Sequence, residues 1–291
     1  MPRFAKMPRL LIVGCGDVGM RCLPLLRGRW RIAALTSSPQ RFDELRAAGA
    51  TPILGNLDDA ASLNRLSGWA DAVLHLAPPQ NTGSTDLRTR NLLRSLAGSP
   101  PARIVYASTT GVYGDCGGAF FDESRAVAPS TDRARRRVDA EAQLRAFDTT
   151  VTILRVPGIY ASNRVGGHPR ERLAKGSPVL RAEDDVFTNH IHADDLARAC
   201  VLALYRGRPQ RVLHVCDDSN LRMGDYFDLA ADLCGLPRPP RVSRAEAAAL
   251  MSPMQLSFMS ESRRLDNHRL KSELKLRLRY PLPETGLLAP P

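Results

Sequence analysis

The residue pattern with the clearest chemistry lies near the start of the chain. Residues 10–13 are a Leu-Leu-Ile-Val run typical of a buried strand, and a G-x-G-x-x-G spacing follows them directly. In such a turn we expect Gly14 to bend the backbone, Gly16 to let it approach a pyrophosphate, and Gly19 to let the next helix pack closely. The N–H groups at the start of that helix attract phosphates, which predicts a dinucleotide site rather than a turn without a ligand. The predicted binding residues are Gly14, Gly16, Asp17, Val18 and Gly19.

A second group of polar residues indicates which dinucleotide binds. An acidic residue about 20 positions beyond the glycines holds the ribose 2′-hydroxyl of NAD in such sites. Here that place reads Thr36-Ser37-Ser38-Pro39-Gln40-Arg41, without a carboxylate. The hydroxyls of Thr36, Ser37 and Ser38 and the guanidinium of Arg41 could bind a 2′-phosphate instead. NADP is therefore the expected cofactor, and NAD is the alternative. If these residues bind no ligand, Ser38 simply begins the next helix.

The elements that must position these residues alternate between strands and helices, which is typical of a parallel sheet covered on both faces. Strands are predicted at residues 10–13, 31–36, 51–54, 72–77, 103–108, 150–155 and 212–215, and helices at about 20–26, 39–48, 60–66, 85–96, 131–147 and 194–204. The expected fold class is α/β, a Rossmann-type doubly wound parallel sheet of about seven strands with a smaller C-terminal substrate lobe. The expected domains are a dinucleotide-binding domain at 8–160 plus 188–217 and a substrate lobe at 161–187 plus 218–286.

The composition narrows the class of protein. Of the 291 residues, 43% are hydrophobic and 24% charged, as in an ordinary globular protein, and no apolar run is long enough to cross a membrane. We therefore expect a cytoplasmic protein. The six cysteines form no C-x-x-C pair, so no metal site is expected. The net charge of +11 does not favour a nucleic-acid partner, because the one dense cluster, residues 133–137, has no interleaved aromatic residues.

Four further segments, in order along the chain, carry a family resemblance. They are His75-Leu76-Ala77, Ser108-Thr109-Thr110-Gly111-Val112-Tyr113-Gly114, Arg155-Val156-Pro157-Gly158-Ile159-Tyr160 and Asn189-His190-Ile191-His192-Ala193-Asp194-Asp195-Leu196-Ala197. With the glycine turn they make the chain resemble the extended short-chain dehydrogenase/reductase superfamily, in its NAD-dependent epimerase/dehydratase-like group, over residues 9–280. The resemblance implies NAD(P) binding and cofactor contacts from Leu76, Ala77, Pro78 and Pro157.

The resemblance also implies a catalytic set, from which this chain departs. The substrate-polarising hydroxyl maps onto Thr109, whereas the family's Y-x-x-x-K tyrosine and lysine map onto Arg133 and Arg137, with Glu141 as the anchor. Arginine stays protonated, so Arg133 cannot exchange a proton as tyrosine does, but it can stabilise an oxyanion. Arg137 could hold the nicotinamide ribose. The chain thus resembles an atypical branch that lacks the Y-x-x-x-K pair; the alternative is a solvated helix face, which we expect for residues 135 and 136.

Other acids could substitute for the missing tyrosine. The candidates by type are Tyr113, His168, His190 and His192. The segment around His168 is basic, which suits a phosphate- or carboxylate-bearing substrate as well as it suits a solvated loop; its cations are Arg164, Arg170, Arg172 and Lys175. We therefore expect an oxidoreductase or epimerase-like protein acting on a small anionic carbonyl or sugar-derived substrate. The alternative is a non-catalytic NADP-binding protein that senses redox state.

The resemblance further implies a homodimer through the predicted helices at about 85–97 and 132–147. Seven arginines on these helices would crowd like charges near such an interface: Arg88, Arg90, Arg94, Arg133, Arg135, Arg136 and Arg137. The sequence therefore leaves the oligomeric state open.

Overall fold

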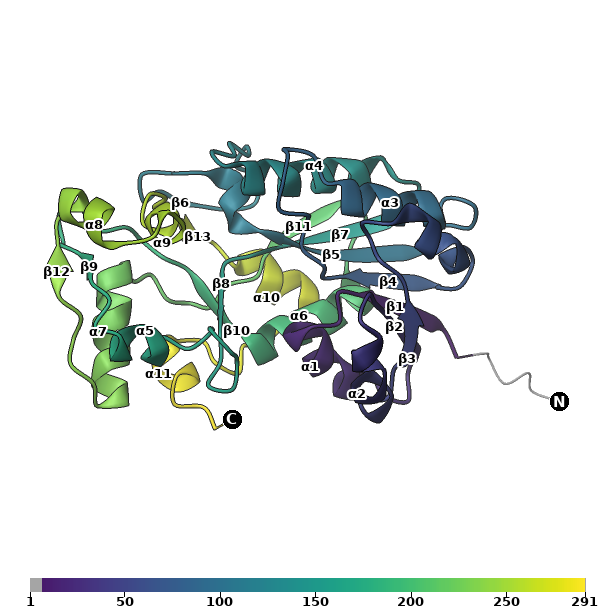
Figure 1. The fold of residues 1–291 in the computed structure, drawn as a ribbon, viewed down its shortest axis with the longest axis horizontal. Coiled ribbons are helices and arrows are strands. Elements are labelled where there is room, and N and C mark those ends of the chain that lie inside the picture. Colours follow the sequence, from purple (N-terminus) through teal and green to yellow (C-terminus); the bar gives the residue numbers. More distant parts are fainter. Residues whose placement is uncertain (1–6, 291) are drawn as a thin grey trace.

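The computed structural model describes residues 7–290, apart from the side chains of residues 253 and 254, and confirms the α/β fold class (Figure 1). The central sheet has seven parallel strands in the order β11-β7-β5-β4-β1-β2-β3. They are β1 (Arg9–Val13), β2 (Arg31–Thr36), β3 (Thr51–Leu54), β4 (Ala72–His75), β5 (Arg103–Thr109), β7 (Thr150–Val156) and β11 (Arg211–His214).

Helices cover both faces of this sheet, as a parallel sheet requires. Figure 1 shows α3 (Leu87–Leu96) and α4 (Asp132–Ala146) on one face, and α1 (Asp17–Leu26), α2 (Phe42–Ala47) and α6 (Ala193–Arg206) on the other. The second group is joined by α10 (His268–Leu274), which contacts α6 and β11. None of the helices in the described part of the chain is both long and apolar enough to cross a membrane.

The strand β1 shows why the sequence forms a two-faced core. Its side chains alternate between faces, because successive residues of a strand point to opposite sides. Leu10 and Ile12 pack with α1 and α6, whereas Leu11 and Val13 pack on the face covered by α3 and α4, and all four are fully buried. The continuous apolar run of residues 10–13 is therefore the signature of a central parallel strand.

The remaining elements gather at one end of the sheet, on the left of Figure 1. Helices α5 (Arg170–Ala174), α7 (Met223–Cys234), α8 (Arg244–Leu250), α9 (Pro253–Phe258) and α11 (Pro283–Gly286) lie there, with strands β9 (Val179–Leu180) and β12 (Arg241–Val242). They share a separate apolar cluster that includes Leu173, Met223 and Phe227. Two-stranded pairs connect this region to the sheet: β8 (Gly158–Tyr160) with β10 (His190–His192), and β6 (Phe120–Phe121) with β13 (Arg264–Leu265). The exact domain limits given above stay a prediction.

The local structure departs from the sequence prediction in three places. The predicted helix at 60–66 is a 3₁₀ helix, and the one at 39–48 divides into a 3₁₀ turn, Pro39–Arg41, followed by α2. The predicted strand at 72–77 ends at His75, because the N–H groups of Leu76 and Ala77 both donate to the carbonyl of Val13. That bend brings residues 76–78 over the glycine turn.

Candidate functional site

The glycine turn between β1 and α1 has the geometry that its sequence predicts. Gly14 has φ +83°, and a Cβ there would lie 2.4 Å from the backbone nitrogen of Ala77, so a larger residue cannot fit. At Gly16 a Cβ would project into open space, toward a cavity that Gly16 itself lines. A Cβ at Gly19 would lie 3.1 Å from the sulfur of Cys15, which is a close approach of helix to turn. The turn thus leaves backbone N–H groups at the start of α1 accessible to an anion.

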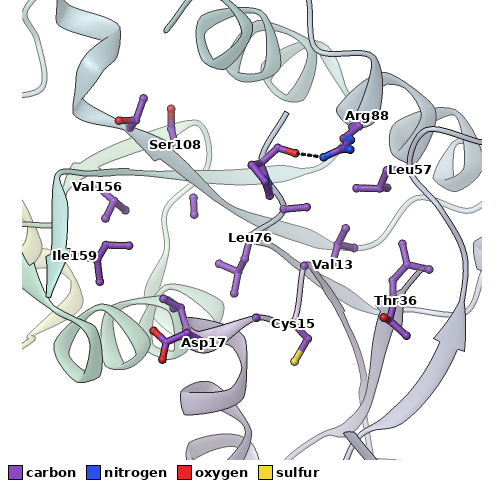
Figure 2. A pocket seen from close by; sticks show the side chains of 18 of the residues that line it. Val13, Cys15, Asp17, Thr36, Leu57, Leu76, Arg88, Ser108, Val156 and Ile159 are labelled. Carbon is purple, nitrogen blue, oxygen red and sulfur yellow. Dashed lines mark hydrogen bonds between the residues drawn. The ribbon is translucent and has the colours of Figure 1, made fainter. Parts of the chain in front are cut away.

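A first cavity of about 570 Å³ opens above this turn (Figure 2). It lies beyond the carboxyl ends of β1 and β4, the two strands between which the strand order reverses, which is the usual ligand site of doubly wound sheets. The predicted cofactor residues that line it are Gly14, Gly16, Asp17, Val18, Thr36, Ser37, Arg41, Leu76, Ala77, Pro78, Arg137 and Pro157. Gly19 and Ser38 do not line it. The lining residues that the sequence did not predict as cofactor contacts include Asn56, Leu57, Arg88, Ser108, Ile159 and Arg164.

One end of the first cavity is polar and basic where β2 ends. The Arg41 guanidinium donates to the carbonyl of Cys15 at 2.7 Å and pairs with the exposed Glu44 at 2.8 Å, and this hydrogen bond lowers the pKa of the Glu44 carboxyl. The Thr36 hydroxyl accepts from the Ser38 N–H at 3.2 Å, which shapes the turn after the strand. Burial raises the pKa of the Cys15 thiol to about 11, so this thiol stays protonated.

An ion-pair network offsets the charge of Asp17, the one carboxylate among the described residues that line the first cavity. Arg21 pairs with Asp17 at 3.0 Å and with Asp194 at 2.6 Å, and Arg164 also pairs with Asp17. Because two guanidinium groups contact it, Asp17 repels a phosphate at the turn less than an isolated carboxylate would. The network also attaches the loop after β8 to the glycine turn.

A second cavity of about 520 Å³ adjoins the first and shares four lining residues with it: Thr109, Pro157, Ile159 and Arg164. The second cavity extends between β8, β10, α5, α7 and α9. Its lining carries four arginines and, among the described residues, a single carboxylate, Glu261. The two cavities therefore meet at the end of β5, where Thr109 lies.

The structure divides the predicted catalytic residues between the two cavities. Arg137 lines the first cavity, where its guanidinium donates to the Tyr106 hydroxyl at 3.0 Å and to the Ala107 carbonyl at 2.8 Å. Arg133 lines the second cavity and stacks over the Phe258 ring, 4.9 Å from its centroid. The two arginines are one helical turn apart on α4, yet they line different cavities.

A buried network anchors α4 on the sheet. Glu141 pairs with Arg155 of β7 at 2.7 Å and accepts from the Ser108 hydroxyl of β5 at 2.6 Å. Arg155 in turn donates to the Tyr113 hydroxyl at 2.6 Å, which contacts His214 at 2.6 Å. Burial raises the pKa of Tyr113 to about 12, and this residue lines neither cavity, which makes it a structural group.

The prediction that Arg136 lies on a solvated face of α4 is wrong. Arg136 is buried and donates to the Gly83 carbonyl, because α4 packs against the loop before α3.

Of the histidine candidates, His168 and His190 line the second cavity and His192 does not. His192 accepts from the Asp194 N–H at 3.2 Å and caps α6. His190 stacks on Tyr226 with ring centroids 3.9 Å apart, and burial lowers its pKa to about 3, so its imidazole is neutral at pH 7. Within the described residues, no cluster of three or more metal-ligating side chains occurs.

Comparison with known proteins agrees with this geometry. The sequence profile of the NAD(P)H-binding family matches residues 14–206. The chain is 25% identical to the protein YeeZ of Escherichia coli K12 over 95% of this chain and 98% of that one. A functionally unknown conserved protein from Silicibacter pomeroyi has 32% identity and a TM-score of 0.81, with 96% of each chain covered.

A solved structure described as MoeE5 in complex with UDP-glucose and NAD shares the fold, with 22% identity, a TM-score of 0.73 and 96% of each chain covered. The family match covers most strands of the central sheet and the four residues that line both cavities. The chain therefore belongs to the NAD(P)H-binding family, and it shares the fold of these solved structures.

Proposed function

We propose that this protein is an NADP-linked oxidoreductase or epimerase-like enzyme that acts on a small anionic carbonyl or sugar-derived substrate. The observation that carries the proposal is the pair of adjoining cavities that meet at Thr109. The first suits a dinucleotide, and the second, about 520 Å³ in volume, is within the usual range of small-ligand sites.

Residues of this chain fit each part of the dinucleotide. The glycine turn and the start of α1 would hold the pyrophosphate. Arg137 would hold the ribose next to the nicotinamide, since its guanidinium lines the cavity beside Thr109. At the other end, Thr36, Ser37 and Arg41 would bind a 2′-phosphate, and the end of β2 carries no carboxylate to repel it. The preference for NADP over NAD rests on this last feature.

The chemistry supplied by the bound nicotinamide is hydride transfer. The Thr109 hydroxyl and the Arg133 guanidinium would donate hydrogen bonds to the substrate oxygen and stabilise negative charge that develops there. Reduction of a carbonyl adds a hydride to carbon and a proton to oxygen, and Arg133 cannot supply that proton. We assign the proton to water or to another side chain of the second cavity.

The alternative is a non-catalytic NADP-binding protein that reports redox state. It is favoured by one observation: nowhere in the sequence does a lysine follow a tyrosine by four positions. Under this alternative Arg137 would still bind the cofactor, and the second cavity would serve recognition rather than turnover.

Calorimetric titration of the full chain with NADPH and NADH tests the cofactor assignment. We expect both to bind and NADPH to bind more tightly. If neither binds, both functions are wrong. Turnover on a panel of carbonyl compounds and sugar nucleotides, compared between wild type and the Arg133→Tyr, Arg137→Lys double variant, then separates them. A wild type that binds NADPH but turns over nothing supports the redox-sensing alternative.

The homodimer stays a prediction, but repulsion between arginines on α3 and α4 is a weaker argument against it than the sequence indicated. Arg88 pairs with Asp58 at 2.6 Å, Arg136 is buried, and Arg137 lines the first cavity, so these three do not crowd an exposed helix surface. A light-scattering mass measured in solution would decide it.

A further inference from the structure

One arginine of the second cavity has no charged partner in the part of the chain that the structure describes. Arg172, on α5, lines the cavity and is only partly exposed. Within the described residues its guanidinium makes a single hydrogen bond, from Nη2 to the Pro178 carbonyl at 3.0 Å, and its Nε is buried without a partner. Burial lowers the pKa of Arg172, and no carboxylate offsets that effect. Since a desolvated cation without a counter-ion costs free energy, its presence beside a cavity calls for a functional reason.

The other arginines of this cavity differ from Arg172. Arg164 is paired with Asp17, and Arg263 is paired with Glu261 at 2.7 Å. The paired guanidinium groups are largely neutralised, so the positive charge available to a ligand comes from Arg172 and from the more exposed Arg133 at the edge of the cavity.

Among the described residues, Arg172 and Arg133 each pack on an aromatic ring and have no carboxylate partner. The Arg172 guanidinium lies over the Phe227 ring, 4.4 Å from its centroid, as Arg133 lies over Phe258. A guanidinium stacked on a ring keeps donors at its edge for an anion, because stacking uses its face. Among the described residues, neither Nε nor Nη1 of Arg172 has a hydrogen-bond partner, and because Nε is buried, Nη1 is the donor left for a ligand.

The cavity is also unusually aromatic. Phenylalanine, tyrosine and tryptophan make up 5% of the chain but 5 of the 25 residues that line this cavity. These are Tyr160, Phe187, Tyr226, Phe227 and Phe258. Rings of this kind favour the apolar or planar body of a ligand, while a few charged groups fix its orientation.

We infer that Arg172 binds the acid group of an organic acid, a carboxylate or a phosphate monoester, whose planar or apolar body lies against the aromatic lining of the second cavity. This inference rests on the proposed function in taking that cavity as the substrate side of the site. It adds the residue that binds the acid group of the substrate and the planar or apolar character of the rest of the substrate. Arginine suits both acid groups, because its fork of donors matches two oxygens of either one.

Calorimetry on the full chain with three probes of similar size tests the inference: phenylpyruvate, phenyl phosphate and the neutral ketone phenylacetone. We expect one or both acids to bind more tightly than the ketone, and the preferred acid identifies the acid group. Arg172→Met should weaken binding of that acid by about 10- to 100-fold, as expected for a lost charge-assisted hydrogen bond. Arg172→Lys should bind with intermediate affinity, since it keeps the charge and loses the fork. The control Arg170→Met removes an exposed arginine of the same helix that does not line the second cavity, so it should leave the affinity for the acid unchanged.

Two further measurements keep the outcome unambiguous. NADPH binding should be unchanged in Arg172→Met, and its unfolding midpoint should not fall, because a buried unpaired charge is removed. The inference is wrong if neither acid outbinds phenylacetone, if Arg172→Met binds the acid as wild type does, or if Arg172→Met loses stability instead of affinity. Acid binding that depends on Arg172 in a protein that binds no nucleotide would refute the proposed function and leave this inference standing.

Discussion

Replacing Glu141 by leucine should destabilise the protein far more than replacing an exposed carboxylate of the same helix. Glu141 and Arg155 have side chains that are each 5% exposed, and both guanidinium edges of Arg155 are used: Nε and Nη2 on Glu141, and Nη1 on Tyr113. Burial alone would lower the pKa of Arg155, but its hydrogen bonds and charge interaction with Glu141 outweigh that effect and raise it. The leucine would leave this charge buried without a counter-ion.

The loss of stability in Glu141→Leu depends on the Arg155 charge that stays buried after the substitution. Removing one partner of a buried ion pair costs about 3–5 kcal/mol, because the other charge stays desolvated. The Ser108 hydroxyl also loses its acceptor. The matched control is Asp132→Asn, which breaks the exposed pair with Arg135 at 2.7 Å and should cost under about 1 kcal/mol.

Urea unfolding of wild type, Glu141→Leu, Arg155→Met and the double variant measures these free energies of unfolding. The double variant should cost less than the sum of the two single variants by at least about 1 kcal/mol, because it removes both charges. A Glu141→Leu cost below about 1 kcal/mol, or single costs that add within about 0.5 kcal/mol, would refute the reasoning. The folded fraction of Glu141→Leu should also bind NADPH more weakly, since Glu141 lies one helical turn from Arg137 on α4.

Three other perturbations have defined outcomes. Gly14→Ala should abolish measurable NADPH binding in calorimetry while Gly28→Ala, at another positive φ but with open space around it, should not; equal binding in both would contradict the role of the turn. Arg41→Ala should weaken NADPH binding by about tenfold and leave NADH binding unchanged, and an equal loss for both nucleotides would argue against a 2′-phosphate contact. Burial raises the pKa of Asp217 to about 7, so the folded state holds its proton more tightly than the unfolded state, and its contribution to stability is lost as pH rises from about 4 through 7. In Asp217→Asn that part of the pH dependence, about 3–5 kcal/mol, should disappear from unfolding curves measured between pH 4 and 8.

The fold and the geometry of the glycine turn were predictable because their signals are local. A buried strand, three glycines and a helix start follow one another within ten residues, and each residue type indicates the local backbone conformation there. The positive φ of Gly14 and the close approach of Ala77 agree with the role predicted for that glycine. The hydroxyls and Arg41 at the end of β2 were placed in the same way, because the carboxyl ends of parallel strands meet at one edge of the sheet. Asn56, which follows the end of β3, could have been found by the same rule.

The second cavity was harder to predict because its walls come from distant parts of the chain. Phe258 and Arg263 lie more than 100 residues from Thr109, and no local pattern marks them. The basic segment around His168 carried a signal for Arg172, but the sequence could not distinguish it from a solvated loop. The same limit explains the error at Arg136, since helix α4 has charged residues on nearly every face and only packing decides which one is buried.

By itself, then, the sequence determined a doubly wound parallel sheet, the geometry of the glycine turn, and the lack of a tyrosine–lysine pair, because each depends on residues that are neighbours in the chain. Only the tertiary structure decided what the arginines do. Arg133 and Arg137 are four residues apart, but one stacks on Phe258 in the second cavity and the other donates to Tyr106 in the first. Arg172 stands out only in the folded structure, where none of the described residues supplies it with a carboxylate. The charge state of arginine is fixed by its chemistry, whereas its partner is fixed by long-range packing.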